Sequence, residues 1–293
     1  MMNWLQLLQK IQQGDVKSIA RVISLVENEA PGYEELLQTL PASATPVIGI
    51  TGPPGAGKST LTDALIGEMV KEGKKVAVLC VDPSSPFNRG ALLGDRIRMS
   101  EWYNHGSVYI RSLATRGSLG GLHPKIIEIS GLLKAAPFDF IVAETVGVGQ
   151  SEVEIAGLAE LTIVVLVPEA GDEVQIMKAG LMEIADIFVV NKADRPDADT
   201  FLKNLKLMLQ PATDIPAIKT IASQKTGIGE LYSTIGKRLQ QVNASDIKYR
   251  LLAEKAYHLI QKHRMKDISK EELAATMRAE DITNIYAFVK RFY

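Results

Sequence analysis

The feature that most constrains the fold of this chain is a glycine-rich loop between an apolar run and a helical pattern. The run Val47–Thr51 leads into Gly52-Pro-Pro-Gly-Ala-Gly57-Lys58-Ser59, and a helical apolar spacing follows. This matches G-x-x-x-x-G-K-[ST] in the strand–loop–helix context that the motif requires. Glycines let backbone amides turn toward phosphates, and the helix presents its positive N-terminal end. The residues expected to bind a nucleotide are Gly52, Pro53, Pro54, Gly55, Ala56, Gly57, Lys58, Ser59 and Thr60.

Two side chains of this loop carry chemistry of their own. We expect Lys58 to reach the β- and γ-phosphates and to act in catalysis, because its ammonium can neutralise charge on the transferred group. We expect the hydroxyl of Ser59 to ligate Mg²⁺, a cation that prefers oxygen ligands.

Short apolar runs rich in β-branched residues alternate with helical patterns from Pro46 onward. Such runs are typical of parallel strands that helices cover on both faces. The predicted strands are Val47–Thr51, Val76–Asp82, Val108–Leu113, Phe138–Glu144, Leu161–Val167, Ile187–Asn191 and Ala217–Ala222. The chain therefore predicts an α/β fold with a mainly parallel sheet, whose ligands bind beyond the carboxyl ends of the strands.

Helical patterns without strands flank this region on both sides. Residues 1–40 predict a helical extension, in which Ile19, Val22, Ile23 and Val26 form one apolar face. Residues 41–242 predict the nucleotide-binding domain, and residues 243–293 a helical segment. A capping pattern from Ser269 to Glu272 opens one helix of this last segment.

A second motif bears on the choice between ATP and GTP, which the glycine-rich loop alone does not decide. Asn191-Lys192-Ala193-Asp194 lies directly after the apolar residues 187–190. The carboxylate of Asp194 can accept two hydrogen bonds from guanine, whereas adenine would leave it unpaired at a cost of roughly 1–3 kcal/mol. We expect Lys192 to lie along the base and Asn191 to brace the loop. Alone the motif would equally suit a polar loop, but beside the phosphate loop it favours guanine.

The segment after the last predicted strand is placed to complete the base site. It consists of Thr220, Ile221, Ala222 and Ser223, and a backbone amide there can donate to the guanine oxygen O6. The sequence of this segment is otherwise unremarkable in composition, so its position carries the assignment.

Acidic residues end two predicted strands at the edge where the phosphate loop lies. Glu144 opens Glu-Thr-Val-Gly147, at the place where many nucleotide hydrolases carry D-x-x-G. We expect Glu144 to hold Mg²⁺ through water and to act in catalysis, and the amide of Gly147 to sense the γ-phosphate. Asp82 ends its strand at the same edge, and Asp95 follows in a segment typical of a switch. Both aspartates are candidate metal-shell residues, and each could instead cap a turn.

Three further features concern hydrolysis and its control. Gln150 could orient the attacking water or could begin a solvated helix. Gly171-Asp172-Glu173 could sense the nucleotide or could cap the following helix. No arginine finger can be assigned from Arg89, Arg96, Arg98, Arg111 and Arg116, so we expect slow hydrolysis that a partner accelerates.

Composition excludes several classes of protein. The formal net charge of −1 implies no bulk attraction to nucleic acid or to an anionic membrane. A single cysteine, Cys80, rules out a disulfide framework and suits a reducing compartment. No apolar stretch approaches the roughly 20 residues that span a bilayer, and the N-terminus lacks the features of a signal peptide. We therefore expect a cytoplasmic protein without nucleic-acid or membrane partners.

Taken together, these motifs resemble those of the MeaB/ArgK-type P-loop GTPases, the methylmalonyl-CoA mutase-associated family. The resemblance runs from about Ser18 to Ser223. Besides the phosphate loop, the matching segments are Ala20–Glu27, Val81–Ser85, Leu92–Met99, Arg116–Gly121, Glu144–Glu152, Ala170–Gln175 and Asn191–Asp194. The pair E-T-V-G-V-G-Q-S-E and A-G-D-E-x-Q separates this family from signal-recognition and nickel-insertion GTPases.

The resemblance implies more than the residues do by themselves. Family members are homodimers that bind GTP or GDP with Mg²⁺ and hydrolyse GTP slowly. They act as chaperones of an adenosylcobalamin-dependent acyl-CoA mutase, gating cofactor loading and protecting the mutase. By analogy, residues 170–175 would form an extra switch that faces the partner, and the C-terminal helices would form the dimer contact.

The sequence departs from the family pattern at a few residues, and it leaves two alternative functions open. Glu169 stands where the family pattern has a glycine, and His123-Pro124-Lys125 is unusual, with His123 most simply a loop residue. One alternative is a kinase linked to amino-acid transport, against which the guanine motif argues. Another is a metallochaperone for a different metalloenzyme, but four dispersed histidines and one cysteine form no delivery motif.

Overall fold

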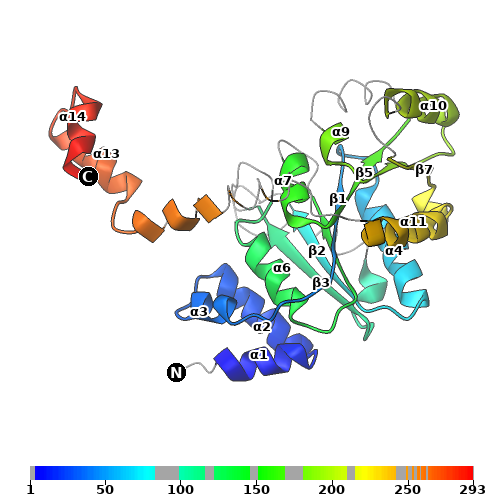
Figure 1. Cartoon of the computed structure of the whole chain (residues 1–293), viewed down its shortest axis with the longest axis horizontal. Coiled ribbons are helices and arrows are strands. Elements are labelled where there is room, and N and C mark those ends of the chain that lie inside the picture. Colours follow the sequence, from blue (N-terminus) through cyan, green and yellow to red (C-terminus); the bar gives the residue numbers. More distant parts are fainter. Residues whose placement is uncertain are drawn as a thin grey trace. The chain divides into compact units, whose positions relative to one another are not determined.

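The computed structural model describes residues 4–82, 99–115, 122–145, 151–168, 181–209 and 215–241, and most of 249–292 (Figure 1). Contacts divide the chain into two compact units, Met1–Lys248 and Tyr249–Tyr293. The predicted residues Asp95, Gly147, Gln150 and Glu169, and the segment 170–175, lie outside the described part of the chain.

A seven-stranded sheet forms the centre of the first unit, with the order β3-β2-β4-β1-β5-β6-β7. Every neighbouring pair of strands is parallel, so the predicted α/β class is confirmed. The strands are β1 Val47–Thr51, β2 Val76–Asp82, β3 Val108–Ala114, β4 Phe140–Glu144, β5 Leu161–Leu166, β6 Ile187–Val190 and β7 Ala217–Lys219. The chain adds strands on one side of β1 up to β4 and on the other side from β5 onward. A ligand site is expected at such a switch point, beyond the carboxyl end of β1.

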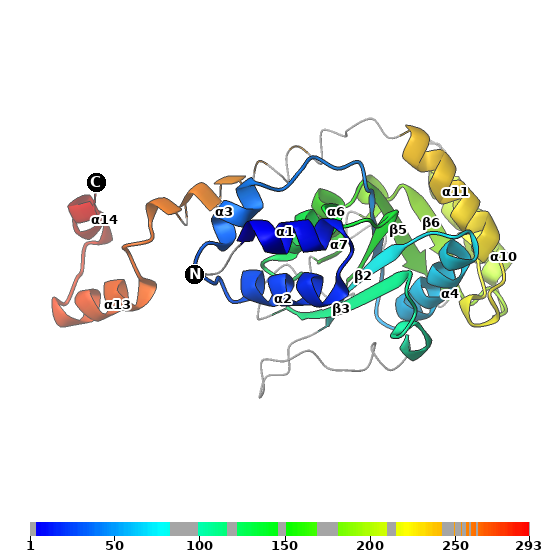
Figure 2. The ribbon, with the colours of Figure 1, turned by 90° about the horizontal axis from the view of Figure 1, so that it is seen from below.

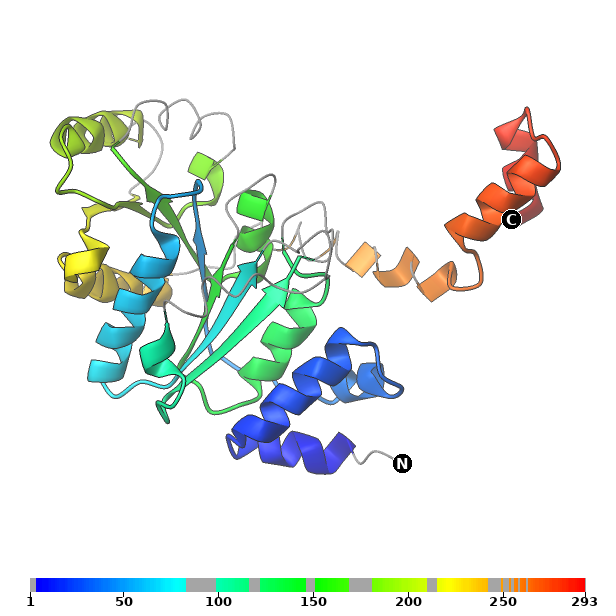
Figure 3. The same ribbon diagram turned by 180° about the vertical axis from the view of Figure 1, so that it is seen from behind.

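Helices cover both faces of the sheet, as Figures 2 and 3 show. Those of the first unit, with their short 3₁₀ turns, are α1 Trp4–Gln12, α2 Val16–Glu27, α3 Tyr33–Gln38, α4 Lys58–Lys71, η1 Ser100–Trp102, α6 Ile126–Lys134, α7 Ser151–Leu158, α9 Leu181–Ile184, α10 Ala198–Leu209, η2 Ala222–Gln224 and α11 Ile228–Gln241. None of the helices in the described ranges is long and apolar enough to cross a membrane.

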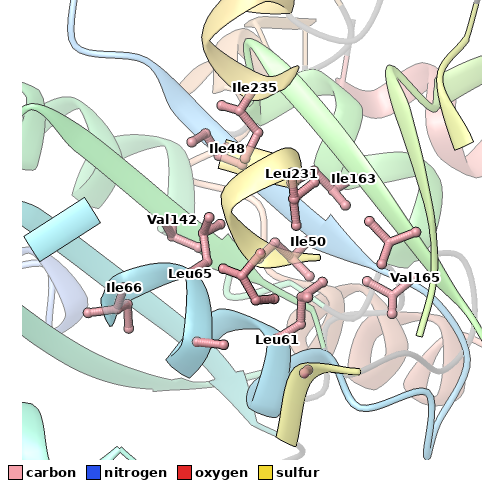
Figure 4. Close-up of a cluster of buried hydrophobic side chains, with 14 of the residues drawn as sticks. Ile48, Ile50, Leu61, Leu65, Ile66, Val142, Ile163, Val165, Leu231 and Ile235 are labelled. Carbon is pink, nitrogen blue, oxygen red and sulfur yellow. The ribbon is translucent and has the colours of Figure 1, made fainter. Parts of the chain in front are cut away.

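The core on one face of the sheet packs α4 and α11 against the central strands. Figure 4 shows this cluster, in which strand residues such as Ile50 and Val165 meet Leu61 and Leu65 of α4 and Leu231 of α11. All five residues of β1 are buried, which explains its uninterrupted apolar pattern. Burial on this face fixes the start of α4 directly behind the glycine-rich loop.

The N-terminal helices pack on the opposite face of the sheet. The predicted apolar face of α2, formed by Ile19, Val22, Ile23 and Val26, is fully buried in a cluster with α6 and the strands. Asp15 caps α2, because its Oδ2 accepts a hydrogen bond of 2.9 Å from the backbone N–H of Ser18.

The second unit is helical in its described residues, as predicted. It contains α13 Lys270–Ala279, α14 Ile285–Val289 and the 3₁₀ turn η3 Lys290–Phe292. The predicted cap at Ser269 is present, since its Oγ accepts a 3.0 Å hydrogen bond from the N–H of Glu272. Large apolar side chains stay exposed in this unit, and Tyr286 is 83% exposed.

Candidate nucleotide-binding site

The glycine-rich loop follows β1 and turns tightly under the start of α4. Gly52 has φ +137°, and a Cβ there would lie 2.1 Å from the carbonyl oxygen of Val165 in β5. Gly57 has φ +87°, and a Cβ there would lie 2.5 Å from Nδ2 of Asn191. Only glycine fits these two positions, because a side chain would be strained by the backbone and would also clash. The packing of β5 and Asn191 against the loop therefore explains two glycines of the motif.

Lys58 is buried and lies across the loop that precedes it. Its Nζ donates to the carbonyl oxygens of Gly52 at 2.9 Å and of Pro53 at 3.1 Å. The ammonium is thus held at the concave side of a loop whose amides can receive phosphate oxygens. The role of Lys58 at the β- and γ-phosphates stays a prediction.

Glu144 ends β4 beside β1 and is 3% exposed. Its Oε1 accepts a 2.6 Å hydrogen bond from Oγ of Ser59, and its Oε2 accepts one of 2.9 Å from Oγ1 of Thr62. The two predicted metal residues Ser59 and Glu144 are therefore in direct contact. Their hydroxyl and carboxylate oxygens suit Mg²⁺, which binds oxygen ligands and keeps several waters.

The other predicted metal residues are less completely described. Asp82 is the last residue of β2 and pairs in register with Ala114, so its backbone reaches the same edge of the sheet as Glu144. Within the ranges that the structure covers, no group of three or more His, Cys, Asp or Glu residues is arranged to hold a metal. Ser59 and Glu144, whose oxygens lie 2.6 Å apart, therefore stay predicted metal residues.

Two threonines link the phosphate loop to the end of β4. The Oγ1 atoms of Thr51 and Thr145 lie 3.0 Å apart and are buried. The N–H of Thr145 also donates to the carbonyl of Ile50 at 3.0 Å. Sequence reasoning did not single out this pair, although both residues adjoin motifs that it used.

Asn191 joins the phosphate loop to the loop after β7. Its Nδ2 donates to the carbonyl of Ala56 at 2.9 Å, while its Oδ1 accepts from Oγ1 of Thr220 and from the N–H of Ala222, each at 3.1 Å. The side chain is buried, and all three contacts use one amide group. Asn191 therefore contacts two loops, the phosphate loop and the loop after β7.

The remaining residues of the guanine motif lie at the surface beside this brace. Lys192 has φ +56°, and the N–H of Ala193 donates to the carbonyl of Thr220 at 3.0 Å. Asp194 is exposed, so its carboxylate is accessible to a base.

The segment after β7 is held close to the motif. Ile221 pairs with Thr226 in an isolated bridge, Ala222 is buried at the start of η2, and Ser223 is exposed. The structure thus brings Asn191, Lys192 and Asp194 together with Ile221, Ala222 and Ser223, at one end of the phosphate loop.

The model of the family described as methylmalonyl Co-A mutase-associated GTPase MeaB matches residues 19–278. The chain belongs to the MeaB family. A Pyrococcus abyssi protein assigned to the GTPases is 48% identical over 240 residues, covering 78% of this chain and 74% of the relative. GTPase ArgK of Escherichia coli is 36% identical over 260 residues, covering 80% of this chain and 78% of the relative.

The chain is also similar to part of a larger enzyme and to a solved structure. A fused isobutyryl-CoA mutase of Geobacillus kaustophilus is 37% identical over 237 residues, covering 74% of this chain and 22% of that protein. A solved structure described as a LAO/AO transport system kinase is 24% identical, with a TM-score of 0.66, and covers 99% of this chain and 97% of its own. At this identity, the similarity to the transport system kinase supports the fold only.

Arg111 and His123, two candidate residues of the sequence analysis, make their contacts away from the phosphate loop in this MeaB-family chain. Nη2 of Arg111 donates to Glu27 of α2 and, at 3.1 Å, to Oγ of Ser24. His123 is 2% exposed, and its Nδ1 accepts a 3.0 Å hydrogen bond from the N–H of Lys125. The Arg111 contacts tie α2 to β3, and Nε2 of His123 lies 3.8 Å from Oε1 of Glu27 in α2, so we assign neither residue to the phosphate site.

Lys125 also contacts the N-terminal helical region. Its Nζ lies 2.8 Å from Oε1 of Glu29 and donates to the hydroxyl of Tyr33 at 3.0 Å. Burial opposes the charged form of Lys125, but the hydrogen bonds to Glu29 and Tyr33 outweigh it and raise the pKa of the ammonium. The unusual sequence at 123–125 is therefore explained by packing against the N-terminal helices.

Proposed function

We propose that this chain is a Mg²⁺-dependent GTPase that acts as a chaperone of an adenosylcobalamin-dependent acyl-CoA mutase, gating cofactor loading. The observation that carries the proposal is the Geobacillus kaustophilus relative, in which a region similar to 74% of this chain is part of a fused isobutyryl-CoA mutase. The family description, which names methylmalonyl-CoA mutase, points to the same class of partner.

The nucleotide chemistry is proposed from the geometry of the loop and the brace. Lys58 would neutralise charge on the β- and γ-phosphates, and backbone amides of residues 52–60 would bind their oxygens. Asp194 would accept the guanine N1–H and N2 amine, and the amides near Ala222 would donate to O6. Asn191 would fix the distance between the phosphate loop and the base-binding segment after β7. Its contacts with Ala56 and Ala222 support this role.

The metal would be held by oxygen atoms of Ser59 and Glu144, with Asp82 and Asp95 as further members of its shell. When bound, Mg²⁺ would offset the negative charge that develops on the phosphates. Gln150 is proposed to orient the attacking water, and the amide of Gly147 to respond to the γ-phosphate. Arg111 is engaged with Glu27, so we do not propose it as an arginine finger.

A homodimer is part of the proposal and is supported by the exposed apolar side chains of the C-terminal unit. They include Leu259, Ile260, Ile285, Tyr286 and Phe292, all at least 45% exposed. Such a density of exposed large apolar residues in one short unit is typical of a surface that another chain covers.

The proposal is tested by measuring GTP turnover with and without an adenosylcobalamin-dependent acyl-CoA mutase, with ATP as the control. We expect slow hydrolysis of GTP, no hydrolysis of ATP, and acceleration by the mutase. GTP hydrolysis that the mutase leaves unchanged would contradict the partner assignment only. Equal use of ATP would contradict the nucleotide assignment, and transfer of labelled γ-phosphate to a protein acceptor would favour the transport-kinase alternative.

A further inference from the structure

Thr62 is a buried polar residue that the nucleotide motif does not require. The motif ends at Ser59, and Thr62 lies one helical turn further along α4, with no exposed surface. Its Oγ1 lies 2.9 Å from Oε2 of Glu144 and 3.0 Å from the carbonyl oxygen of Lys58. A hydroxyl is thus built into the core directly behind the phosphate loop.

Ser59 and Thr62 divide the carboxylate of Glu144 between them. Residues three apart in a helix share a face, so both hydroxyls point from α4 toward the end of β4. Ser59 donates to Oε1 and Thr62 donates to Oε2. Two donors on different oxygens fix the rotation of the carboxylate plane. A single donor would leave that torsion broad, as it is for glutamate side chains in general.

The hydroxyl proton of Thr62 has two acceptors to choose from. The carbonyl of Lys58 is the helical back-bond that threonine makes in many helices. An ionised carboxylate is the stronger acceptor, and hydrogen bonds to charged oxygen are roughly twice as strong as neutral ones. The contact with Glu144 therefore takes the proton when the carboxylate is ionised.

We propose that Thr62 is a positioning residue for the metal site. It holds Oε2 of Glu144 so that Oε1 stays beside the hydroxyl of Ser59, and these two oxygens are the pair that fits Mg²⁺. The inference rests on the proposed GTPase function and assigns a residue outside its motifs. Thr62 itself touches neither nucleotide nor metal.

The test compares the affinity for a fluorescent N-methylanthraniloyl derivative of GDP in excess Mg²⁺ and in EDTA. Thr62→Val removes the hydroxyl with little change in shape, and Thr62→Ser keeps it. Thr234→Val is a matched control, because Thr234 of α11 makes the same back-bond, 2.9 Å to the carbonyl of Glu230, on an exposed surface. The quantity of interest is the gain in affinity that Mg²⁺ provides to each protein.

We expect Thr62→Val to lose about three- to tenfold of that gain, the range of a typical net hydrogen-bond contribution, because the lost bond acts on the metal only through Glu144. Its affinity in EDTA should be unchanged, and Thr62→Ser and Thr234→Val should both behave as the wild type.

An unchanged gain in Thr62→Val, an equal loss in EDTA, or an equal loss in Thr62→Ser would overturn the positioning role. If the valine variant does not fold, Thr62→Ala replaces it with the same expectations. A wild-type protein that binds the GDP derivative without any gain from Mg²⁺ would contradict the proposed function as well.

Discussion

Single residues of this chain do more than the motifs that contain them suggest. Asn191 contacts both the phosphate loop and the segment after β7, and Gly57 is a glycine because Nδ2 of Asn191 fills the place of its Cβ. Two motifs separated by more than a hundred residues are thus parts of one contact. The predicted phosphate loop and the predicted base loop are therefore linked through the atoms of one side chain.

Exchange of Asp194 tests the base assignment. Asp194→Asn should shift the preference from GTP toward xanthosine triphosphate, because the amide donates where the carboxylate accepts. The loss of GTP affinity should amount to roughly 1–3 kcal/mol, the cost of an unmade hydrogen bond to a polar group. Competition binding with the two triphosphates measures it. Wild-type affinity for GTP in the variant would refute the assignment of Asp194.

Removal of the Lys58 ammonium tests the phosphate assignment. Lys58→Ala should nearly abolish GTP hydrolysis, because it removes the ammonium that the loop carbonyls hold where the phosphates are expected to bind. The same change removes two hydrogen bonds to loop carbonyls. Circular dichroism and the melting temperature are therefore needed to show that the variant folds. Hydrolysis at the wild-type rate by a folded variant would exclude the proposed role.

At the scale of elements, the sequence predicts the sheet well because buried parallel strands are apolar on both faces. All seven expected strands are present, and β1 and β2 have the predicted bounds. The last strand ends at Lys219 rather than at Ala222. The reason is that Ile221 pairs with Thr226 and Ala222 begins η2, which are local contacts that apolarity does not encode.

The candidate site could be predicted only in part, for a related reason. Sequence spacing places Lys58, Ser59, Glu144 and Asn191 at one edge of the sheet, because each follows or precedes a strand. It does not reveal which donors each side chain meets. Thr62 illustrates this limit, since an isolated threonine in a helix carries no pattern until β4 is placed beside α4.

The half-buried carboxylate of Asp186, just before β6, offers a test of how burial of a charge affects stability. Asp186 accepts a 2.7 Å hydrogen bond from the N–H of Thr162, but burial raises its pKa. The ionised form therefore costs stability at neutral pH, and this cost disappears as the pH falls below the unfolded value near 4.

Asp186→Asn should accordingly raise the midpoint of urea unfolding at pH 7 and change it little at pH 3.5. Asp139→Asn is the matched control. Its carboxylate also accepts from a backbone N–H, that of Lys75 at 2.8 Å, but on an exposed surface. An equal gain for Asp186→Asn at both pH values would show that burial of charge is not the cause.

At the scale of the whole molecule, the chain has one large unit that carries the nucleotide site and one small helical unit. The N-terminal helices belong to the large unit, where Glu27, Arg111 and Lys125 anchor them. Among the residues that the structure describes in the small unit, Phe288 is a buried large apolar residue, whereas Ile285, Tyr286 and Phe292 are exposed. This asymmetry underlies the proposal of self-association.

The oligomeric state follows as a prediction. Light scattering after gel filtration should give the mass of a dimer, and the double variant Ile285→Asp/Tyr286→Asp should shift it toward the monomer. Leu207→Asp, at an exposed apolar position on α10, should leave the dimer intact. A monomeric wild type, or a dimer that only Leu207→Asp disrupts, would contradict the role of the C-terminal unit.

The shared amide of Asn191 has a consequence that resembles a chelate effect. The amide of Asn191 holds the base loop and the phosphate loop at a fixed distance before a nucleotide binds. Binding therefore does not have to pay the entropic cost of ordering the two loops relative to each other. Guanosine and pyrophosphate, offered as separate molecules, should then bind far more weakly than the joined nucleotide. The difference combines the translational and rotational freedom that joining the two molecules saves with the fixed spacing between the loops.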